Sequence, residues 1–134
     1  MTVLNINGIT KNFGSLVAND NISLNLDAGE VLALLGENGA GKTTLMNILF
    51  GHYVADQGGI EIFGNPLPAG APEAAIEAGV GMVHQHFTLA ENLSVLENII
   101  LGTEPLLAWK SDTAAARAKL DALAEQYGMK VEPD

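Results

Sequence analysis

The residues best suited to chemistry lie in one short segment, Gly36-Glu37-Asn38-Gly39-Ala40-Gly41-Lys42-Thr43. Its spacing fits G-x-x-x-x-G-K-[ST], which is typical of loops that hold the phosphates of a nucleoside triphosphate. Such a loop needs glycine because successive backbone N–H groups must curl around phosphate oxygens, where a side chain would block the approach. The segment therefore predicts phosphate binding, with ATP as the expected ligand.

The polar residues at the end of the segment have separate expected roles. Lys42 would reach the β- and γ-phosphates from the start of a helix, whose positive N-terminal end adds favourable electrostatics. Thr43 would hold Mg²⁺ through its hydroxyl, and Thr44 could donate to the α-phosphate. The alternative is a glycine-rich turn whose lysine is merely solvated. The expected nucleotide-binding residues here are Gly36, Glu37, Asn38, Gly39, Ala40, Gly41, Lys42, Thr43 and Thr44.

The sequence around this loop predicts the elements that position it. Residues 31–35 are a continuous apolar run of strand length, the pattern of a strand buried on both faces in a parallel sheet. Residues 44–50 have helical character, and Gly51 is placed to end that helix. Upstream, residues 3–6 and the alternating run 22–26 predict half-buried strands of an antiparallel layer. The order strand, loop, helix supports the phosphate-binding interpretation.

Further elements are expected downstream of the loop. The pattern predicts a short strand at 60–62, a short helix at 73–78, another buried strand at 80–83 and a last helix from 112 to 127. Ser94, with Glu97 three residues later, forms a capping box, so a further helix begins there. His84 and His86 follow the strand at 80–83 and can chelate a metal, but no third ligand is in view.

Composition and charge restrict the class of protein. The chain has 134 residues, 48% of them hydrophobic, which fits about one globular domain. Its formal net charge of −10 repels a phosphodiester backbone, so we expect no nucleic-acid partner. Cysteine is absent, and neither a secretory signal nor a membrane-spanning run is seen. The cytoplasm is the expected compartment.

The segments around the loop carry a family resemblance. The stretch ITKNFGSLVANDNISLNLDAGEVLALLGENGAGKTTLMNILFG resembles the ATP-binding subunit of ABC transporters, and the likeness continues through GGIEIFG and GMVHQHF over essentially the whole chain. It implies an α/β fold, with a P-loop NTPase core, an antiparallel β layer at the N-terminus and the start of an α-helical subdomain. It also implies an ATP-binding core segment at residues 1–91 and the helical start at 92–134.

Two further site residues follow from this resemblance. Phe13, within KNFG, stands where the family has an aromatic residue, usually tyrosine, that stacks on adenine. Phenylalanine keeps the stacking face and loses only the hydroxyl, although an ordinary core side chain is the alternative. Gln85, in MVHQ, matches the glutamine that contacts Mg²⁺ and the attacking water. The resemblance therefore assigns catalysis to Lys42 and Gln85, and metal binding to Thr43 and Gln85.

The wording GMVHQHFTLAENLSVLENIILGTEP looks most like the ATPase subunits of simple-sugar and nucleoside importers. This implies an integral-membrane permease as partner, a second nucleotide-binding domain, and a peripheral position on the inner face of the cell membrane. Two other hypotheses stay open at this point. One is a soluble ABC-type ATPase of DNA repair or translation, and the other is a binding-only ATP module.

Several family elements are not found in the sequence, namely the LSGGQ-type signature, the Walker B strand with Asp-Glu, the D-loop and the switch histidine. The segment from Tyr127 to Val131 resembles the part that shortly precedes the signature. We therefore expect the chain to be an N-terminal fragment, ending before the signature, with at most weak ATP affinity and negligible hydrolysis.

Overall fold

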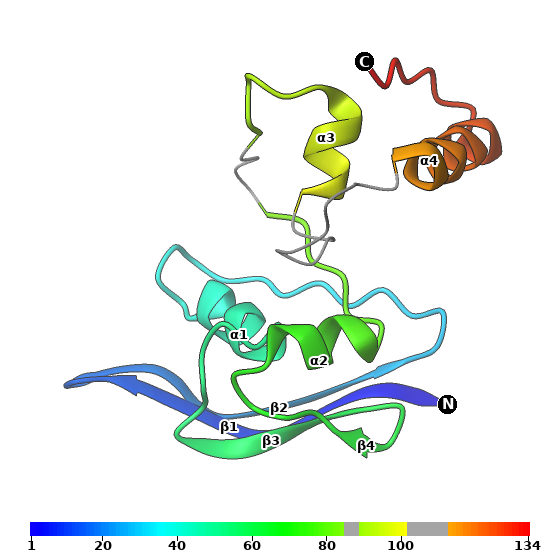
Figure 1. Cartoon of the computed structure of the whole chain (residues 1–134). Coiled ribbons are helices and arrows are strands. Elements are labelled where there is room, and N and C mark those ends of the chain that lie inside the picture. The colour runs from blue at the N-terminus through cyan, green and yellow to red at the C-terminus, as the bar shows by residue number, and fades with distance from the viewer. Residues whose placement is uncertain (85–88, 102–112) are drawn as a thin grey trace. The chain divides into compact units, whose positions relative to one another are not determined.

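Two twelve-residue strands, β1 (Thr2–Phe13) and β2 (Leu16–Asp27), open the computed structural model, which describes residues 1–84, 89–101 and 113–134 (Figure 1). They pair antiparallel, from Thr2 opposite Asp27 to Phe13 opposite Leu16. This confirms the predicted antiparallel layer. The described residues divide into two units, Met1–Val83 and His84–Asp134.

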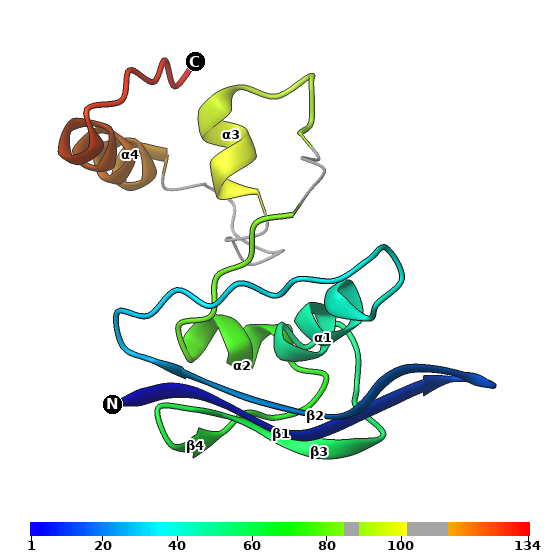
Figure 2. The ribbon, with the colours of Figure 1, turned by 180° about the vertical axis from the view of Figure 1, so that it is seen from behind.

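The sheet of the first unit has four strands in the order β2-β1-β3-β4. Strand β3 (Gln57–Ile62) pairs antiparallel with β1, and the two-residue β4 (Asn65–Pro66) pairs antiparallel with β3. The predicted strand at 60–62 is thus confirmed and begins three residues earlier. The hairpin of β1 and β2 forms one side of the sheet and extends beyond β3, as Figure 2 shows from behind.

An irregularity in β1 decides which residues enter the core. Ile6 and Ile9 are both 1% exposed, although strict alternation would place them on opposite faces of the sheet. The pairing register shifts between them, and Gly8 adopts a φ of +62° within the shift. The N–H of Gly8 donates to the Ser23 hydroxyl at 2.9 Å instead of to the ladder. A bulge of this kind therefore returns Ile9 to the buried face.

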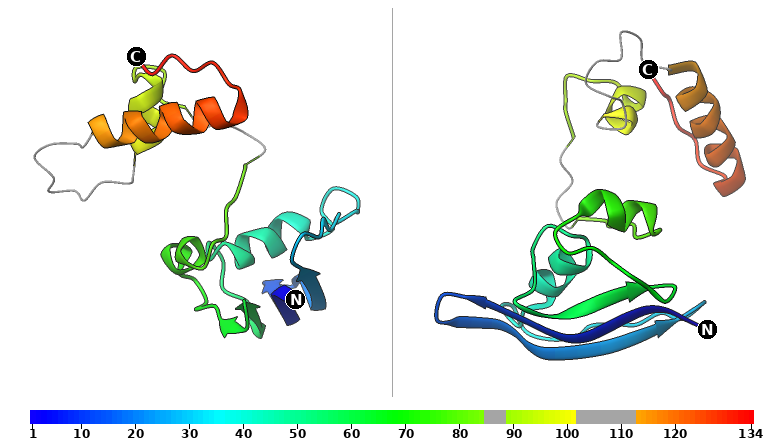
Figure 3. Two further views of the ribbon diagram at one scale, coloured as in Figure 1. Left: turned by 90° about the vertical axis from the view of Figure 1, so that its right-hand side faces the viewer. Right: turned by 60° about the horizontal axis from the view of Figure 1, so that its bottom comes forward.

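Helix α1 (Lys42–Leu49) packs on one face of the sheet and completes the core. Helix α2 (Pro72–Glu77) lies on the same face of the sheet (Figures 1 and 3). The buried hydrophobic cluster consists of Ile6, Ile9, Leu45, Ile48, Ile60 and Ile62. Leu45 and Ile48 lie three residues apart, so one face of α1 meets the sheet. Gly51, at a φ of +86°, donates its N–H to the carbonyl of Ile48 and ends this helix as predicted.

The two predicted strands at 31–35 and 80–83 are wrong for this structure, because both segments lack secondary structure. A strand buried on both faces requires hydrogen-bonded neighbours. Within the described ranges, no strand runs beside residues 31–35, and the side chains of Val31 and Leu35 are 95% and 92% exposed. The apolar composition of these segments favours a strand, but the pairing that would stabilise one is not formed here.

The second unit contains α3 (Val95–Ile100) and α4 (Thr113–Tyr127). The capping box is confirmed, since Glu97 N–H donates to the Ser94 hydroxyl and Ser94 N–H donates to the Glu97 carboxylate at 2.8 Å. Gly128, at a φ of +65°, follows α4 as predicted. Among the described helices, none is long and apolar enough to cross a membrane.

The segment before α3 and the end of the chain both attach to this helix. Asn98 donates through Nδ2 to the carbonyls of Ala90, Leu93 and Ser94, and its Oδ1 accepts the N–H of Ala90 at 2.9 Å. Leu96, 4% exposed, donates its N–H to the carbonyl of Pro133. The second unit is therefore stabilised by hydrogen bonds from loop and tail to a short helix.

Candidate phosphate-binding site

The glycine-rich segment forms a loop that ends at the first residue of α1. Within it, Ala40 N–H donates to the carbonyl of Glu37 at 3.1 Å, so the backbone turns tightly. Gly39 and Gly41 both have positive φ angles, +88° and +82°, which L-residues with side chains rarely adopt. The sequence prediction of a glycine-dependent loop directly before a helix is thus confirmed in its geometry.

Lys42 turns back across this loop. Its Nζ donates to the carbonyl oxygens of Gly36 at 2.6 Å and Glu37 at 2.8 Å. An ammonium group carries three N–H donors, so two of them are accounted for by the first two residues of the segment. The positive charge therefore lies within the curve of the loop, where an anion held by the backbone N–H groups would meet it.

The start of α1 presents unpaired backbone donors. Gly41 is the N-cap, and no side chain caps the helix. The first intrahelical bond is from Leu45 N–H to the Gly41 carbonyl, at 2.9 Å. The N–H groups of Lys42, Thr43 and Thr44 have no acceptor among the described residues, as expected of a first helical turn. Such a terminus favours anions, because its dipole adds to the free donors.

The two threonines differ in exposure. Thr43 is exposed and Thr44 is partly buried, both in the first turn of α1. An exposed hydroxyl is a hard oxygen ligand of the kind that Mg²⁺ takes alongside phosphate oxygens and water. The structure therefore leaves Thr43 exposed, as the predicted role requires, and places Thr44 where its N–H faces the same end of the helix.

The loop packs directly against β2. A Cβ atom on Gly41 would lie 2.1 Å from the Ala18 carbonyl oxygen, and Asn19 donates through Nδ2 to the Gly41 carbonyl at 3.2 Å. Both residues belong to the hairpin that carries Phe13 near its turn. Sequence reasoning missed Asn19, because the alternation of residues 22–26 places odd-numbered positions on the polar face and so gives no sign that Asn19 is buried.

Phe13 ends β1, and its side chain is 44% exposed. Its ring meets Tyr53 edge to face, with centroids 5.6 Å apart, and the ammonium of Lys11 lies 5.3 Å from its centroid. An exposed aromatic face held by a second ring is suited to stacking on a flat base. Tyr53 was not predicted, since nothing in its sequence context distinguishes it from a loop residue.

The carboxylate of Asp56 fixes the backbone just before Phe13. It accepts the Asn12 N–H at 2.7 Å, the Asn12 side-chain amide at 3.2 Å and the Lys11 ammonium at 3.2 Å. The Asn12 N–H, with help from Lys11, holds the pKa of Asp56 below its usual value of 3.8. The contact thus ties the end of β1 to the segment that leads into β3.

Gln85 and His86 lie outside the described residues, so their predicted roles stay predictions. His84 is described. Among the described residues, no three or more His, Cys, Asp or Glu side chains form a group that could hold a metal ion.

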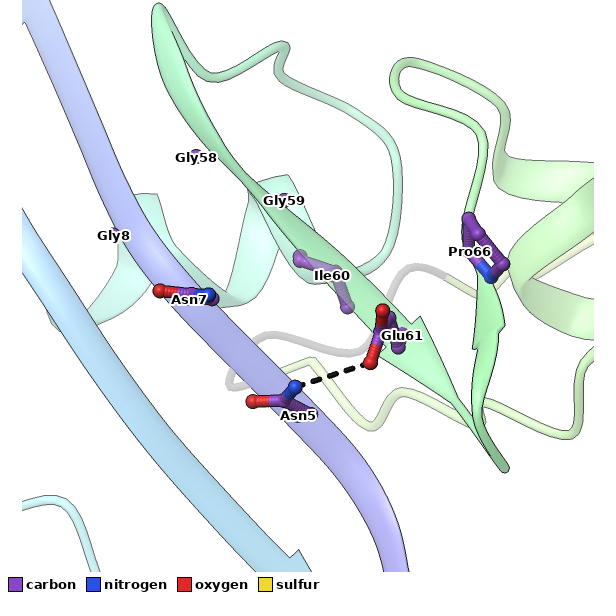
Figure 4. A pocket seen from close by; sticks show the side chains of 8 residues that line it. All are labelled: Asn5, Asn7, Gly8, Gly58, Gly59, Ile60, Glu61 and Pro66. Carbon is purple, nitrogen blue, oxygen red and sulfur yellow. Dashed lines mark hydrogen bonds between the residues drawn. The ribbon is translucent and has the colours of Figure 1, made fainter.

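A shallow hollow on the sheet contains none of the predicted site residues. It is lined by Asn5, Asn7, Gly8, Gly58, Gly59, Ile60, Glu61 and Pro66 (Figure 4). Asn5 Nδ2 donates to the Glu61 carboxylate at 3.1 Å across it. Asn5 and Asn7 flank the buried Ile6 along β1, so their side chains point to the face away from the core. The glycine-rich loop and this hollow are therefore separate features.

Comparison with known proteins agrees with this geometry. A family model described as ABC transporter matches residues 19–134. The nucleoside import ATP-binding protein NupA of Lactococcus lactis subsp. cremoris (strain MG1363) is 47% identical over 133 residues, covering 99% of this chain and 26% of the relative. The guanosine import ATP-binding protein NupO of Bacillus subtilis (strain 168) is 45% identical, covering 98% and 26%. The chain thus spans about a quarter of the length of these relatives.

Solved structures confirm the fold class. A nucleotide-free ATP-binding cassette from an ABC transporter aligns with a TM-score of 0.77 and 27% identity, covering 95% of this chain and 56% of that one. The ADP conformation of another ATP-binding cassette aligns with a TM-score of 0.70 and 26% identity, covering 98% and 48%. Because the family model matches residues 19–134, which is most of its length, the chain belongs to the ABC transporter family.

Proposed function

We propose that this chain is the ATP-binding segment of an ABC transporter ATPase that powers solute import, of a sugar or a nucleoside, through an integral-membrane permease. The observation that carries the proposal is the position of Lys42, whose ammonium lies inside the glycine loop at the open end of α1. A positive charge and free backbone donors meet at one place, which is what a polyphosphate requires. The names of the importer relatives support the choice of solute class.

In this proposal, different residues of the chain bind different parts of ATP. The loop from Gly36 to Gly41 surrounds the phosphates through its N–H groups, and Lys42 leaves its two carbonyl partners to pair with phosphate oxygens. Thr44 donates to the α-phosphate. Phe13 stacks on adenine, with Tyr53 supporting its ring from the edge. Catalysis in the intact protein is then mainly positioning and charge neutralisation by these groups.

The donor set also fits Mg²⁺. The exposed Thr43 hydroxyl offers one oxygen ligand, and Gln85 would offer another. When bound, the ion neutralises charge on the phosphates. Two protein oxygens are fewer than the six ligands that Mg²⁺ takes, so water and phosphate oxygens would supply the rest.

The wider assembly belongs to the same proposal. The proposed partners are a membrane permease and a second nucleotide-binding domain. The proposed location of the protein is the cytoplasmic, inner face of the cell membrane. Residues 1–91 would form the ATP-binding core segment and residues 92–134 the start of the helical subdomain. Hydrolysis belongs to the intact protein, because the 134 residues contain no Asp-Glu pair to complete the site.

Isothermal titration of the chain with ATP and Mg²⁺ tests the proposal. We expect weak, saturable binding that inorganic tripolyphosphate displaces. Lys42→Ala is expected to weaken it by at least about tenfold, since a charge-assisted contact is lost. Lys130→Ala, which removes an equal charge in the tail, is the matched control. Equal ATP affinity in Lys42→Ala and wild type would contradict the proposal.

An ATPase assay tests the expected lack of turnover. We expect no steady Mg²⁺-dependent phosphate release from the chain by itself. Steady turnover that Lys42→Ala abolishes would show that the chain carries a complete catalytic site, against the proposed division of roles.

A further inference from the structure

Asn19 is the one buried polar residue in the part of the chain that the structure describes, with 5% of its surface exposed. It lies in β2 opposite Lys11, with Ala18 and Asp20 as its neighbours in the strand. A polar side chain at a buried position loses its hydration and needs hydrogen bonds in return. The hydrogen bonds of Asn19 therefore indicate the role of this side chain.

Asn19 satisfies only one of its two polar ends. Its Nδ2 donates to the Gly41 carbonyl at 3.2 Å, whereas its Oδ1 has no hydrogen-bond partner among the described residues. Since the Gly41 carbonyl can only accept, the orientation of the amide follows from this contact. A half-satisfied buried amide is less favourable for folding than an apolar side chain of similar size. Stability of the fold therefore does not account for Asn19.

The contact acts on one peptide group, that between Gly41 and Lys42. The Gly41 carbonyl accepts both Asn19 Nδ2 and the N–H of Leu45, at 3.2 and 2.9 Å. Because a peptide group is planar and trans, its N–H points opposite to its carbonyl. Holding the carbonyl toward β2 and the body of α1 therefore aims the Lys42 N–H out of the helix start, toward the position proposed for phosphate.

We infer that Asn19 is a positioning residue of the phosphate loop. Its amide sets the orientation of the Gly41–Lys42 peptide group, so that the Lys42 N–H is prepared to donate to a phosphate oxygen. The inference rests on the proposed function, because it names a residue that acts on the same site. The unpaired Oδ1 of Asn19 makes the fold less stable, and the inference explains this loss by the role of Asn19 in the site.

Asn19→Leu is the sharpest test, because leucine has a similar volume and no amide. We expect the melting temperature of the chain without nucleotide to stay the same or rise, while the Kd for ATP increases about 3- to 10-fold, as for one lost hydrogen bond. Asn25→Leu is the matched control, since Asn25 is an exposed asparagine of the same strand. It is expected to keep the wild-type affinity.

A spectroscopic measurement separates positioning from a merely structural role. In ¹H–¹⁵N spectra without nucleotide, Asn19→Leu is expected to shift the Lys42 amide resonance well beyond the change in Asn25→Leu. If leucine prevents folding, Asn19→Ala decides the same comparison, because it removes the amide without adding bulk. Wild-type ATP affinity with an unshifted Lys42 amide would overturn the inference, and so would a joint fall in stability and affinity with that amide unshifted.

The two proposals fail in different ways. If the wild-type chain does not bind ATP, the proposed function fails, and the Lys42 resonance in Asn19→Leu still decides whether Asn19 orients the loop.

Discussion

Gly41 approaches Ala18 so closely that a Cβ atom on the glycine would lie 2.1 Å from the carbonyl oxygen of Ala18. This glycine is therefore required twice, once by its φ of +82° and once by its packing against β2. Gly39 shares the first requirement, at +88°, but a Cβ there would meet nothing within 4 Å. The two glycines of one motif thus differ in what they do for the fold.

Gly41→Ala is expected to destabilise the chain much more than Gly39→Ala. Both variants meet backbone strain at positive φ, roughly 1 kcal/mol or somewhat more. Only Gly41→Ala adds a clash with β2, for which we expect at least about 2 kcal/mol in addition. Denaturant unfolding of both variants measures the difference. Equal losses in the free energy of unfolding would contradict the close packing of Gly41 against Ala18.

Phe13→Ala is expected to weaken ATP binding by roughly 1–3 kcal/mol, the usual range for stacking of a base on an aromatic side chain. The affinity for inorganic tripolyphosphate should not change, because that ligand has no base. Phe13→Tyr, which keeps the ring, is the conservative control. Titration with both ligands makes the comparison, and an equal loss for the two ligands would point to damage to the loop instead.

Asp56 predicts a specific dependence of stability on pH. The pKa of its carboxyl is lower in the folded chain than the usual 3.8, so its contribution is present above that value and is lost as the pH falls through the folded pKa. Asp56→Asn is therefore expected to melt below the wild type near neutral pH, with the gap closing as the pH falls below the usual carboxyl pKa of 3.8.

Melting curves across this pH range make the measurement for Asp56. Asp20→Asn is the matched control, because the Asp20 carboxylate accepts no hydrogen bond among the described residues. A gap between wild type and Asp56→Asn that stayed constant down to low pH would show that its charge is not the source of the effect.

Ser94→Ala is expected to loosen the start of α3. The hydroxyl of Ser94 accepts the Glu97 N–H, and losing such a cap usually costs about 1 kcal/mol. Amide hydrogen exchange of Val95 to Glu97 is expected to become faster, whereas Ser94→Thr, which keeps the hydroxyl, should remain close to the wild type. Unchanged exchange in Ser94→Ala would mean that the contacts of Asn98 alone hold this turn.

Much of the candidate site could be predicted from the sequence because its signals are local. The spacing of Gly36, Gly41 and Lys42 depends on the chemistry of phosphate binding, and the helix that follows is marked by its own apolar pattern and by Gly51. The capping box at Ser94 and Glu97 is equally local. Each of these features involves residues a few positions apart, so no knowledge of the fold was required.

The remaining features depend on which segments pair and pack. Residues 31–35 have the composition of a buried strand, yet strand formation requires a neighbour, and none lies beside them in the described residues. The burial of both Ile6 and Ile9 depends on a bulge that alternation does not reveal. The sequence alone therefore determined the glycine-rich loop and the helix that follows it. Only the tertiary structure placed Asn19 beneath Gly41, and Tyr53 beside Phe13, because those contacts join residues more than 20 positions apart.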